Sequence, residues 1–159
     1  MSAGAKAAGP RGTVLGKLWT LPNTLLGLAA GGLELALGAR AGRGAGRNAI
    51  EFHDSRLVTW LGRSAIALGN TIHYARGRRP GDAVTRYDGK GRVTLGAHEH
   101  AHTLQFERLG PLFLVVYVCA RLPGVGGEGN AFEHAADDAA AVAGAGRAGP
   151  AGRPGAGVS

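Results

Sequence analysis

Three side chains within five consecutive residues have the types and spacing needed to bind a metal ion and use it. His98 and His102 lie four positions apart, and Glu99 follows the first of them. On a helix this spacing puts both imidazoles on one face, about one turn apart, so that both can reach a single ion. Glu99 points to the side of that face, where a carboxylate can act as the general base toward water. The stretch predicts a zinc (Zn2+) site with Glu99 as the catalytic residue.

A zinc site of this kind needs a third protein ligand and an open position. At about 100° per residue, Gln105 shares the helix face of His98, either as part of the site or as a polar residue at its rim. Glu107 lies about 180° away from His98 on a continuous helix, so the geometry excludes it as the ligand. His100 and Thr103 cluster with Glu107 on a face that we expect to be solvated. The third ligand must therefore come from another element.

The acidic candidate on the last predicted helix is Glu133, followed four positions later by Asp137, so both carboxylates face the same way. Glu133 also has a simpler explanation, because with Asn130 as N-cap it would complete a capping box. Asp137 is correspondingly either tied to the site or solvated beside Asp138. His134 is the reserve ligand if Glu133 serves only the cap.

Helices must position these residues, and the second half of the chain predicts three of them. The first runs from about 95 to 109 and ends before Gly110-Pro111, a typical helix stop. Residues 111–122 are nearly continuously apolar but too short to span a bilayer, which favours a buried helix. A glycine-rich loop leads to the last helix at 131–143. The Ala/Gly/Pro tail from 144 to 159 is expected to be disordered.

The first half of the chain begins with a leader, residues 1–17, that we expect to be disordered. Residues 18–39 are the longest apolar stretch and approach the ~20 residues of a membrane span, but Pro22 and Glu34 interrupt them. A buried or membrane-associated helix is therefore favoured over a cleaved signal peptide. Residues 40–47 form a Gly/Arg connector.

Short β-prone pieces punctuated by Gly and Asn come next, and they predict an antiparallel meander. Residues 75–83 read as an exposed basic loop, and 88–91 as a turn. The expected fold class is α+β: one domain over 18–143, with a small antiparallel β-meander, an N-terminal apolar helix and about three C-terminal helices. The β-prone pieces are 49–53, 57–61, 65–68 and 71–74.

Composition narrows the classes of partner. The formal net charge is +7, yet no DNA- or RNA-binding signature accompanies it, so nucleic acid is not an expected partner. Arg76, Arg78 and Arg79 form the tightest basic run, which keeps a loop soluble or contacts anionic lipid. The single cysteine, Cys119, excludes an internal disulfide and is expected to be a buried small apolar residue.

The motif pair resembles the gluzincin metallopeptidases, which include thermolysin-like enzymes and membrane-bound heat-shock and prenyl-protein proteases. The resemblance rests on His98, Glu99, His102, Glu133 and Asp137. It implies that the two histidines and Glu133 bind zinc, that Glu99 is the base, and that Asp137 holds a ligand histidine from behind. The chain departs from that pattern in its spacer of 30 residues between His102 and Glu133 and in the lack of an obvious large substrate cleft.

A second resemblance is closer and covers most of residues 18–137. Bacterial proteins without an assigned activity combine W-T-L-P-N-T, L-G-N-T-I and H-E-x-x-H-T-x-Q-x-E-x-x-G-P-L-F. The matching segments of this chain are Trp19 to Thr24, Leu68 to Ile72, and His98 to Phe113.

Two hypotheses follow. In the first, a zinc metallopeptidase-like protein hydrolyses a peptide or amide bond of a peptide substrate through metal-activated water. In the second, a non-catalytic protein associates with a membrane surface through 18–39 and 111–122, and its metal site is structural or vestigial. The expected location is membrane-associated or cytoplasmic, and secretion stays open as an alternative.

Overall fold

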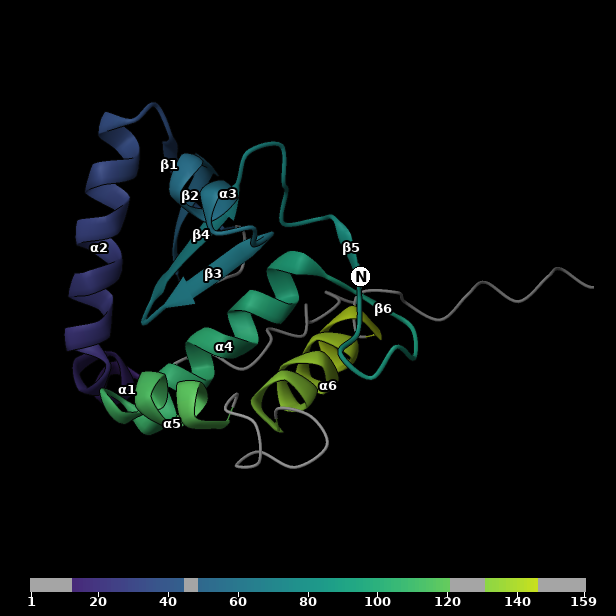
Figure 1. Ribbon diagram of the computed structural model, residues 1–159. Coiled ribbons are helices and arrows are strands. Elements are labelled where there is room, and N and C mark those ends of the chain that lie inside the picture. Colours follow the sequence, from purple (N-terminus) through teal and green to yellow (C-terminus); the bar gives the residue numbers. More distant parts are fainter. Residues whose placement is uncertain (1–12, 45–48, 121–130, 146–159) are drawn as a thin grey trace, which may run out of the picture.

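The computed structural model of the chain describes residues 13–44, 49–120 and 131–145, in which helices surround a small mixed sheet and a separate hairpin (Figure 1). This architecture confirms the predicted α+β class. The helices are α1 (Val14–Trp19), α2 (Leu21–Ala36), α3 (Arg56–Trp60), α4 (Leu95–Leu109), α5 (Leu112–Ala120) and α6 (Ala131–Ala145). The strands are β1 (Arg40–Arg43), β2 (Ile50–Ser55), β3 (Ala65–Leu68), β4 (Thr71–Ala75), β5 (Ala83–Thr85) and β6 (Arg92–Thr94).

The larger sheet has the order β1-β2-β4-β3. β1 pairs antiparallel with β2, and β3 pairs antiparallel with β4, as a meander requires. The two ribbons are joined by a parallel pair, β2 with β4, in which Phe52 lies opposite His73. The sheet is therefore mixed, because α3 and β3 carry the chain back before β4 begins. β1 itself occupies residues 40–43 of the predicted connector, so that part of the connector is an edge strand.

The prediction of an extended piece at 57–61 is wrong, because residues 56–60 form α3. The chain leaves β2 through Asp54, which has a φ of 62°. Ser55 then caps the helix, its hydroxyl accepting a hydrogen bond from the Val58 amide at 3.0 Å. A serine cap outweighs the β propensity of Val58 and its neighbours.

The apolar stretch predicted at 18–39 is helical but broken at Thr20 into α1 and α2. α1 begins at Val14, within the predicted disordered leader, so that prediction is wrong for residues 14–17. Thr13 starts the helix by accepting a hydrogen bond from the Gly16 amide at 3.0 Å. Residues 1–12 lie outside the described ranges.

α2 packs against the sheet through its small residues. A Cβ on Gly31 would lie 2.1 Å from the Phe52 ring, and one on Gly27 would lie 2.1 Å from the Thr71 hydroxyl. Only glycine permits this close approach. One turn further along, Glu34 is 2 % exposed and contacts β4 from above the sheet. This docking fixes the sheet that packs against α4.

The second sheet is the β5–β6 hairpin, and the predicted turn at 88–91 connects its strands. Gly89 and Gly91 have φ values of 73° and 102°, and the Lys90 amide donates to Asp88 Oδ1 at 2.8 Å. β6 leads directly into α4, whose N-cap is Thr94. The hairpin therefore lies beside α4 and α6 (Figure 1), and Arg86 next to its turn pairs with Asp138 in the middle of α6.

α4 confirms the predicted helix, with the expected stop at Gly110. Gly110 has a φ of 58°, and the chain then bends by 119° into α5. α6 extends along α4 on the opposite side from the sheet and spans the predicted last helix (Figure 1). Its predicted N-cap, Asn130, lies outside the described residues, as do residues 146–159 of the predicted tail.

The prediction that 111–122 is a buried helix is wrong for its described part. In α5 the bend leaves one side against α4 and α6, so that Phe113 is buried while Val115 is 61 % exposed. Cys119 is exposed too, against expectation. Among the described helices, none is by itself long and apolar enough to cross a membrane, although α4 and α5 together pass that test as a bent pair.

Candidate metal centre

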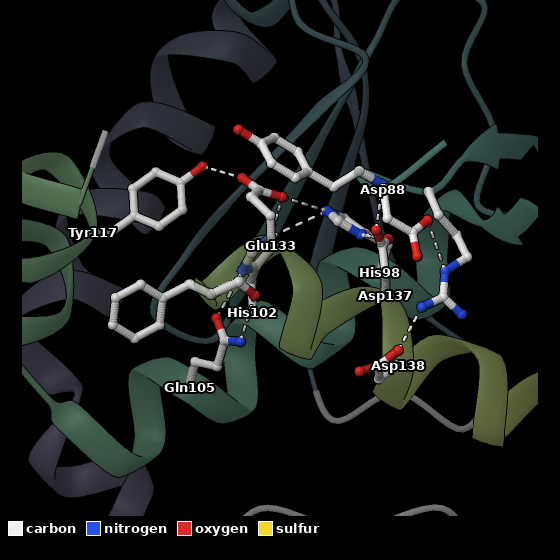
Figure 2. Close-up of polar contacts among 11 residues, drawn as sticks. Asp88, His98, His102, Gln105, Tyr117, Glu133, Asp137 and Asp138 are labelled. Atoms are coloured by element: carbon white, nitrogen blue, oxygen red, sulfur yellow. Dashed lines mark hydrogen bonds and ion pairs between the residues drawn. The ribbon is translucent and has the colours of Figure 1, made fainter. Parts of the chain in front are cut away.

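The side chains of His98, His102 and Glu133 converge on one point between α4 and α6, as Figure 2 shows. The Nε2 atoms of the two histidines are 3.1 Å apart. Glu133 Oε2 lies 3.2 Å from His98 Nε2 and 3.4 Å from His102 Nε2. One turn of α4 supplies the two imidazoles, and the first turn of α6 supplies the carboxylate. This buried His/His/Glu group could hold a metal ion.

The other ring nitrogen of each histidine is occupied. His98 Nδ1 donates to Asp137 Oδ1 at 2.8 Å, and Asp137 Oδ2 accepts from the Tyr87 amide at 2.5 Å. His102 Nδ1 faces Gln105 Oε1 at 2.9 Å. The Gln105 Nε2 donates to the Phe132 carbonyl at 2.9 Å, which fixes the orientation of the amide. Oxygen acceptors therefore hold a proton on both Nδ1 atoms.

With Nδ1 protonated, each neutral imidazole turns an Nε2 lone pair toward the carboxylate oxygen. Three lone pairs that face one point repel one another unless a cation sits between them. The separations of 3.1, 3.2 and 3.4 Å match the edge of a tetrahedron of zinc ligands, about 3.3 Å for bonds of about 2.0–2.1 Å. The donor set and its spacing could therefore hold a metal ion.

A proton can occupy the same point when no metal does. Burial opposes protonation of His98, but the hydrogen bond to Glu133 and the charges of Glu99 and Asp137 outweigh it and raise its pKa to about 9. Burial likewise disfavours the Glu133 carboxylate, yet hydrogen bonds from His102, His98 and Tyr117 hold its pKa well below the usual range. The cluster is thus built to attract positive charge.

Glu99 lies beside this cluster, buried to 6 % exposure. Burial raises the pKa of its carboxyl above the ordinary value, while His102, His98 and a hydrogen bond from the Ala67 amide oppose the rise. A carboxylate with a raised pKa is a better base than an exposed one. Because Ala67 belongs to β3, the hydrogen bond also ties Glu99 to the edge of the sheet.

A cavity of about 520 Å³ opens onto the same residues. Contrary to the expectation of no large cleft, its volume falls within the range of small-ligand sites. β3 forms one wall, and Phe113, Leu114 and Tyr117 of α5 form an apolar wall on the other side. The His/His/Glu group therefore has an open side, which a catalytic metal site requires.

Tyr117 is the residue of this site that sequence reasoning missed. Its hydroxyl donates a hydrogen bond to Glu133 Oε1, the oxygen that turns away from the histidines (Figure 2). A signal was present, because Tyr117 carries the one hydroxyl in the apolar run of α5 and a half-buried tyrosine hydroxyl usually has a partner. Its partner lies on α6, which no local pattern could indicate.

The other candidate residues lie elsewhere. Glu107 is not part of the group, in line with the helical geometry, but the expectation of a solvated face is wrong for it and for Thr103. Thr103 is 1 % exposed, and Glu107 Oε1 lies 3.4 Å from Lys17 Nζ because α1 covers that face of α4. His134, the reserve ligand, packs edge-on against Tyr87.

No protein-family model matches the chain, and no curated protein or solved structure matches it either.

Proposed function

We propose that this chain binds one zinc ion through His98, His102 and Glu133 and hydrolyses peptide or amide bonds with Glu99 as the general base. The observation that carries the proposal is the convergence of three lone pairs on one point beside an open cavity. Two imidazoles and one carboxylate are a frequent donor set of catalytic zinc. The resemblance to gluzincin metallopeptidases assigns the same residues to the same roles.

Zinc at this position would supply a Lewis acid that polarises a substrate carbonyl and makes water more acidic. Glu99 takes a proton from the attacking water and delivers it to the leaving nitrogen. Asp137 and Gln105 keep both imidazoles in the tautomer that offers Nε2. Tyr117 holds Glu133 through Oε1, which leaves Oε2 as the atom toward the histidines.

A peptide is the substrate class that the cavity wall favours. Within the described part of the chain, β3 pairs with β4 on one side, and its other edge borders the cavity. An extended chain can add to such an edge through main-chain hydrogen bonds. The Ala67 amide already points from that edge to Glu99, so an added strand would pass directly over the base.

One observation favours a second reading, in which the cluster is a structural ion pair. His98 with a pKa raised to about 9 is a cation at neutral pH, and it sits between the carboxylates of Glu133 and Asp137. In that case the chain needs no metal, and its function lies elsewhere.

Metal analysis together with a hydrolysis assay separates the two readings. Wild-type protein reloaded with zinc should hold one ion per chain and cleave a mixture of quenched-fluorescence peptides. His98→Ala/His102→Ala should hold none, whereas Glu99→Gln should keep its zinc and lose cleavage. His100→Ala on the same helix is the matched control and should behave as wild type. A wild-type protein that takes up no zinc would refute the proposal.

A further inference from the structure

The polar and apolar sides of α2 are reversed relative to those of a helix on the surface of a water-soluble protein. Its polar and small residues face the protein: Asn23, Gly27, Gly31 and Glu34 are buried. Asn23 Nδ2 donates to the Gly110 carbonyl at 2.9 Å, and Glu34 receives the Ser55 hydroxyl at 2.6 Å. Leucines occupy the outward side. A helix normally buries its apolar stripe and turns polar residues to water.

α1 and α5 continue the same surface. Trp19 of α1 lies over Gly110 so closely that a Cβ there would be 2.2 Å from the indole nitrogen. The start of α5 therefore meets the junction of α1 and α2, at the lower left of Figure 1. We call the outward large side chains of the three helices the apolar face: Val14, Leu15, Leu18, Trp19, Leu21, Leu25, Leu26, Leu28, Leu33, Leu35, Leu112, Val115, Val116 and Val118.

This face exposes more apolar surface than a water-soluble monomer usually does. Its members are 37 % to 78 % exposed, and together they present more than the few hundred Å² of apolar patch that a typical monomer shows. Lys17 and Glu34 are the charged residues within the three helices. Glu34 is buried, and Lys17 Nζ lies 3.4 Å from the carboxylate of Glu107, whose side chain is 7 % exposed beside Leu15 and Trp19 at the margin of the face.

A basic residue is exposed at the same margin of the face. Arg108, at the end of α4, lies beside Trp19. Cationic side chains and tryptophan at the margin of an apolar surface are typical of the headgroup level of a membrane.

We propose that the apolar face lies in the acyl region of a lipid bilayer, with Arg108 at the level of anionic headgroups. Lipid suits this face better than a protein partner, because a protein interface carries about one hydrogen bond per 100–200 Å² and α2 turns its polar side chains inward. Polar residues turned to the protein interior and leucines outward are the arrangement of membrane-embedded helices. The inference is independent of the metal site.

Vesicle flotation with the full-length chain tests the proposal. Wild-type protein should float with phosphatidylcholine vesicles, and in a larger fraction when half of the lipid is phosphatidylglycerol. Leu25→Glu/Leu33→Glu should reduce the floated fraction about tenfold or more, because it puts two charges into the acyl region. Val142→Glu on α6 is the matched control, since Val142 is a 75 % exposed apolar residue outside the face. Wild-type protein that stays with the aqueous phase, or a double variant that floats like wild type, would overturn the proposal.

A fluorescence measurement covers the case in which the double variant fails to fold. Trp19 and Trp60 are the two tryptophans, so Trp60→Phe leaves Trp19 as the reporter on the face. Its emission should shift to the blue with vesicles and be quenched by brominated acyl chains. Unchanged emission would contradict lipid contact. Oligomers that form without vesicles and bury Trp19 equally would make a second copy of the chain the occupant, and would overturn the proposal too.

Discussion

Two buried histidine–carboxylate clusters among the described residues differ in how their histidines use the second ring nitrogen. In the first, His73 Nδ1 lies 2.7 Å from Glu34 and its Nε2 lies 2.9 Å from the Thr71 hydroxyl, while Ser55 donates to the same carboxylate. In the second, His98 and His102 use only Nδ1 for support and leave both Nε2 atoms facing Glu133.

This difference separates a cluster that supports the fold from one that could hold a metal ion. The Glu34–His73 cluster is at most 2 % exposed, and its hydrogen bonds join α2 to the sheet. The His98 cluster opens onto a cavity and directs three possible ligand atoms to one point. Both clusters combine histidine with a carboxylate, so the direction of the lone pairs and the open cavity distinguish them.

The largest expected effect is on stability at the closed cluster. Glu34→Ala leaves His73 buried without its acceptor and should lower the free energy of unfolding by about 3–5 kcal/mol. Glu133→Ala is the matched truncation in the open cluster and should cost less, since water in the cavity can solvate the two imidazoles. Urea unfolding of both variants measures the two free energies of unfolding. Equal decreases would mean that the open cavity does not make the second cluster more tolerant of truncation.

The open cluster should show competition between zinc and a proton. His98, with its pKa raised to about 9, carries a proton that zinc must displace. The apparent zinc affinity should rise about tenfold per pH unit, hence about a hundredfold from pH 6 to 8. In metal-free protein the same shift stabilises the fold at low pH, and this contribution is lost as the pH rises through about 9. Competition with a chelator at several pH values measures the affinity; a flat profile would rule out proton displacement at His98.

The residues behind the imidazoles should matter less than the ligands. Asp137→Asn removes the charge behind His98 and sets an amide group against the Tyr87 amide, so zinc affinity should fall about 10- to 100-fold. Asp138→Asn is the control, since Asp138 is exposed and pairs with Arg86 instead. Isothermal titration of both variants tests this. An equal effect in the two would mean that total charge, and not the hydrogen bond to His98, sets the affinity.

The smallest effect should come from a cluster at the surface. The Gly77 amide, Arg40 and Arg79 hold the pKa of Asp54 well below its usual range. This contribution is present above pH 4 and is lost as the pH falls through the lowered pKa. Asp54→Asn, which tolerates the φ of 62°, should cost less than about 1 kcal/mol at pH 7 because solvent screens exposed pairs. Urea unfolding of wild type and Asp54→Asn at pH 7 and pH 3 measures this contribution. If Asp54→Asn lowered the free energy of unfolding as much as Glu34→Ala does, burial would not explain the difference between the two clusters.

The sequence predicted the features that depend on residues close together along the chain. The helix of His98 and His102, its stop at Gly110 and the hairpin turn at Gly89 follow from periodicity and turn residues. Glu133 could be named because it shares a helix with Asp137.

Long-range features escaped prediction for a common reason. The parallel pairing of β2 with β4 depends on where α3 turns the chain, and the partner of Tyr117 depends on how α5 meets α6. The exposure of α5 was missed because an apolar run looks the same whether protein or another environment covers it.

Gly110 joins the N-terminal and C-terminal parts of the described chain, because Trp19 of α1 lies directly over it. Its positive φ and the Trp19 ring leave no room for a Cβ. A smaller residue at position 19 would therefore remove the clash with a new side chain at position 110 but not the backbone strain, so both features favour glycine there. In a chain that lacks the equivalents of His98 and His102, tryptophan and glycine at the positions of Trp19 and Gly110 would indicate that α1 packs on the start of α5 in the same way.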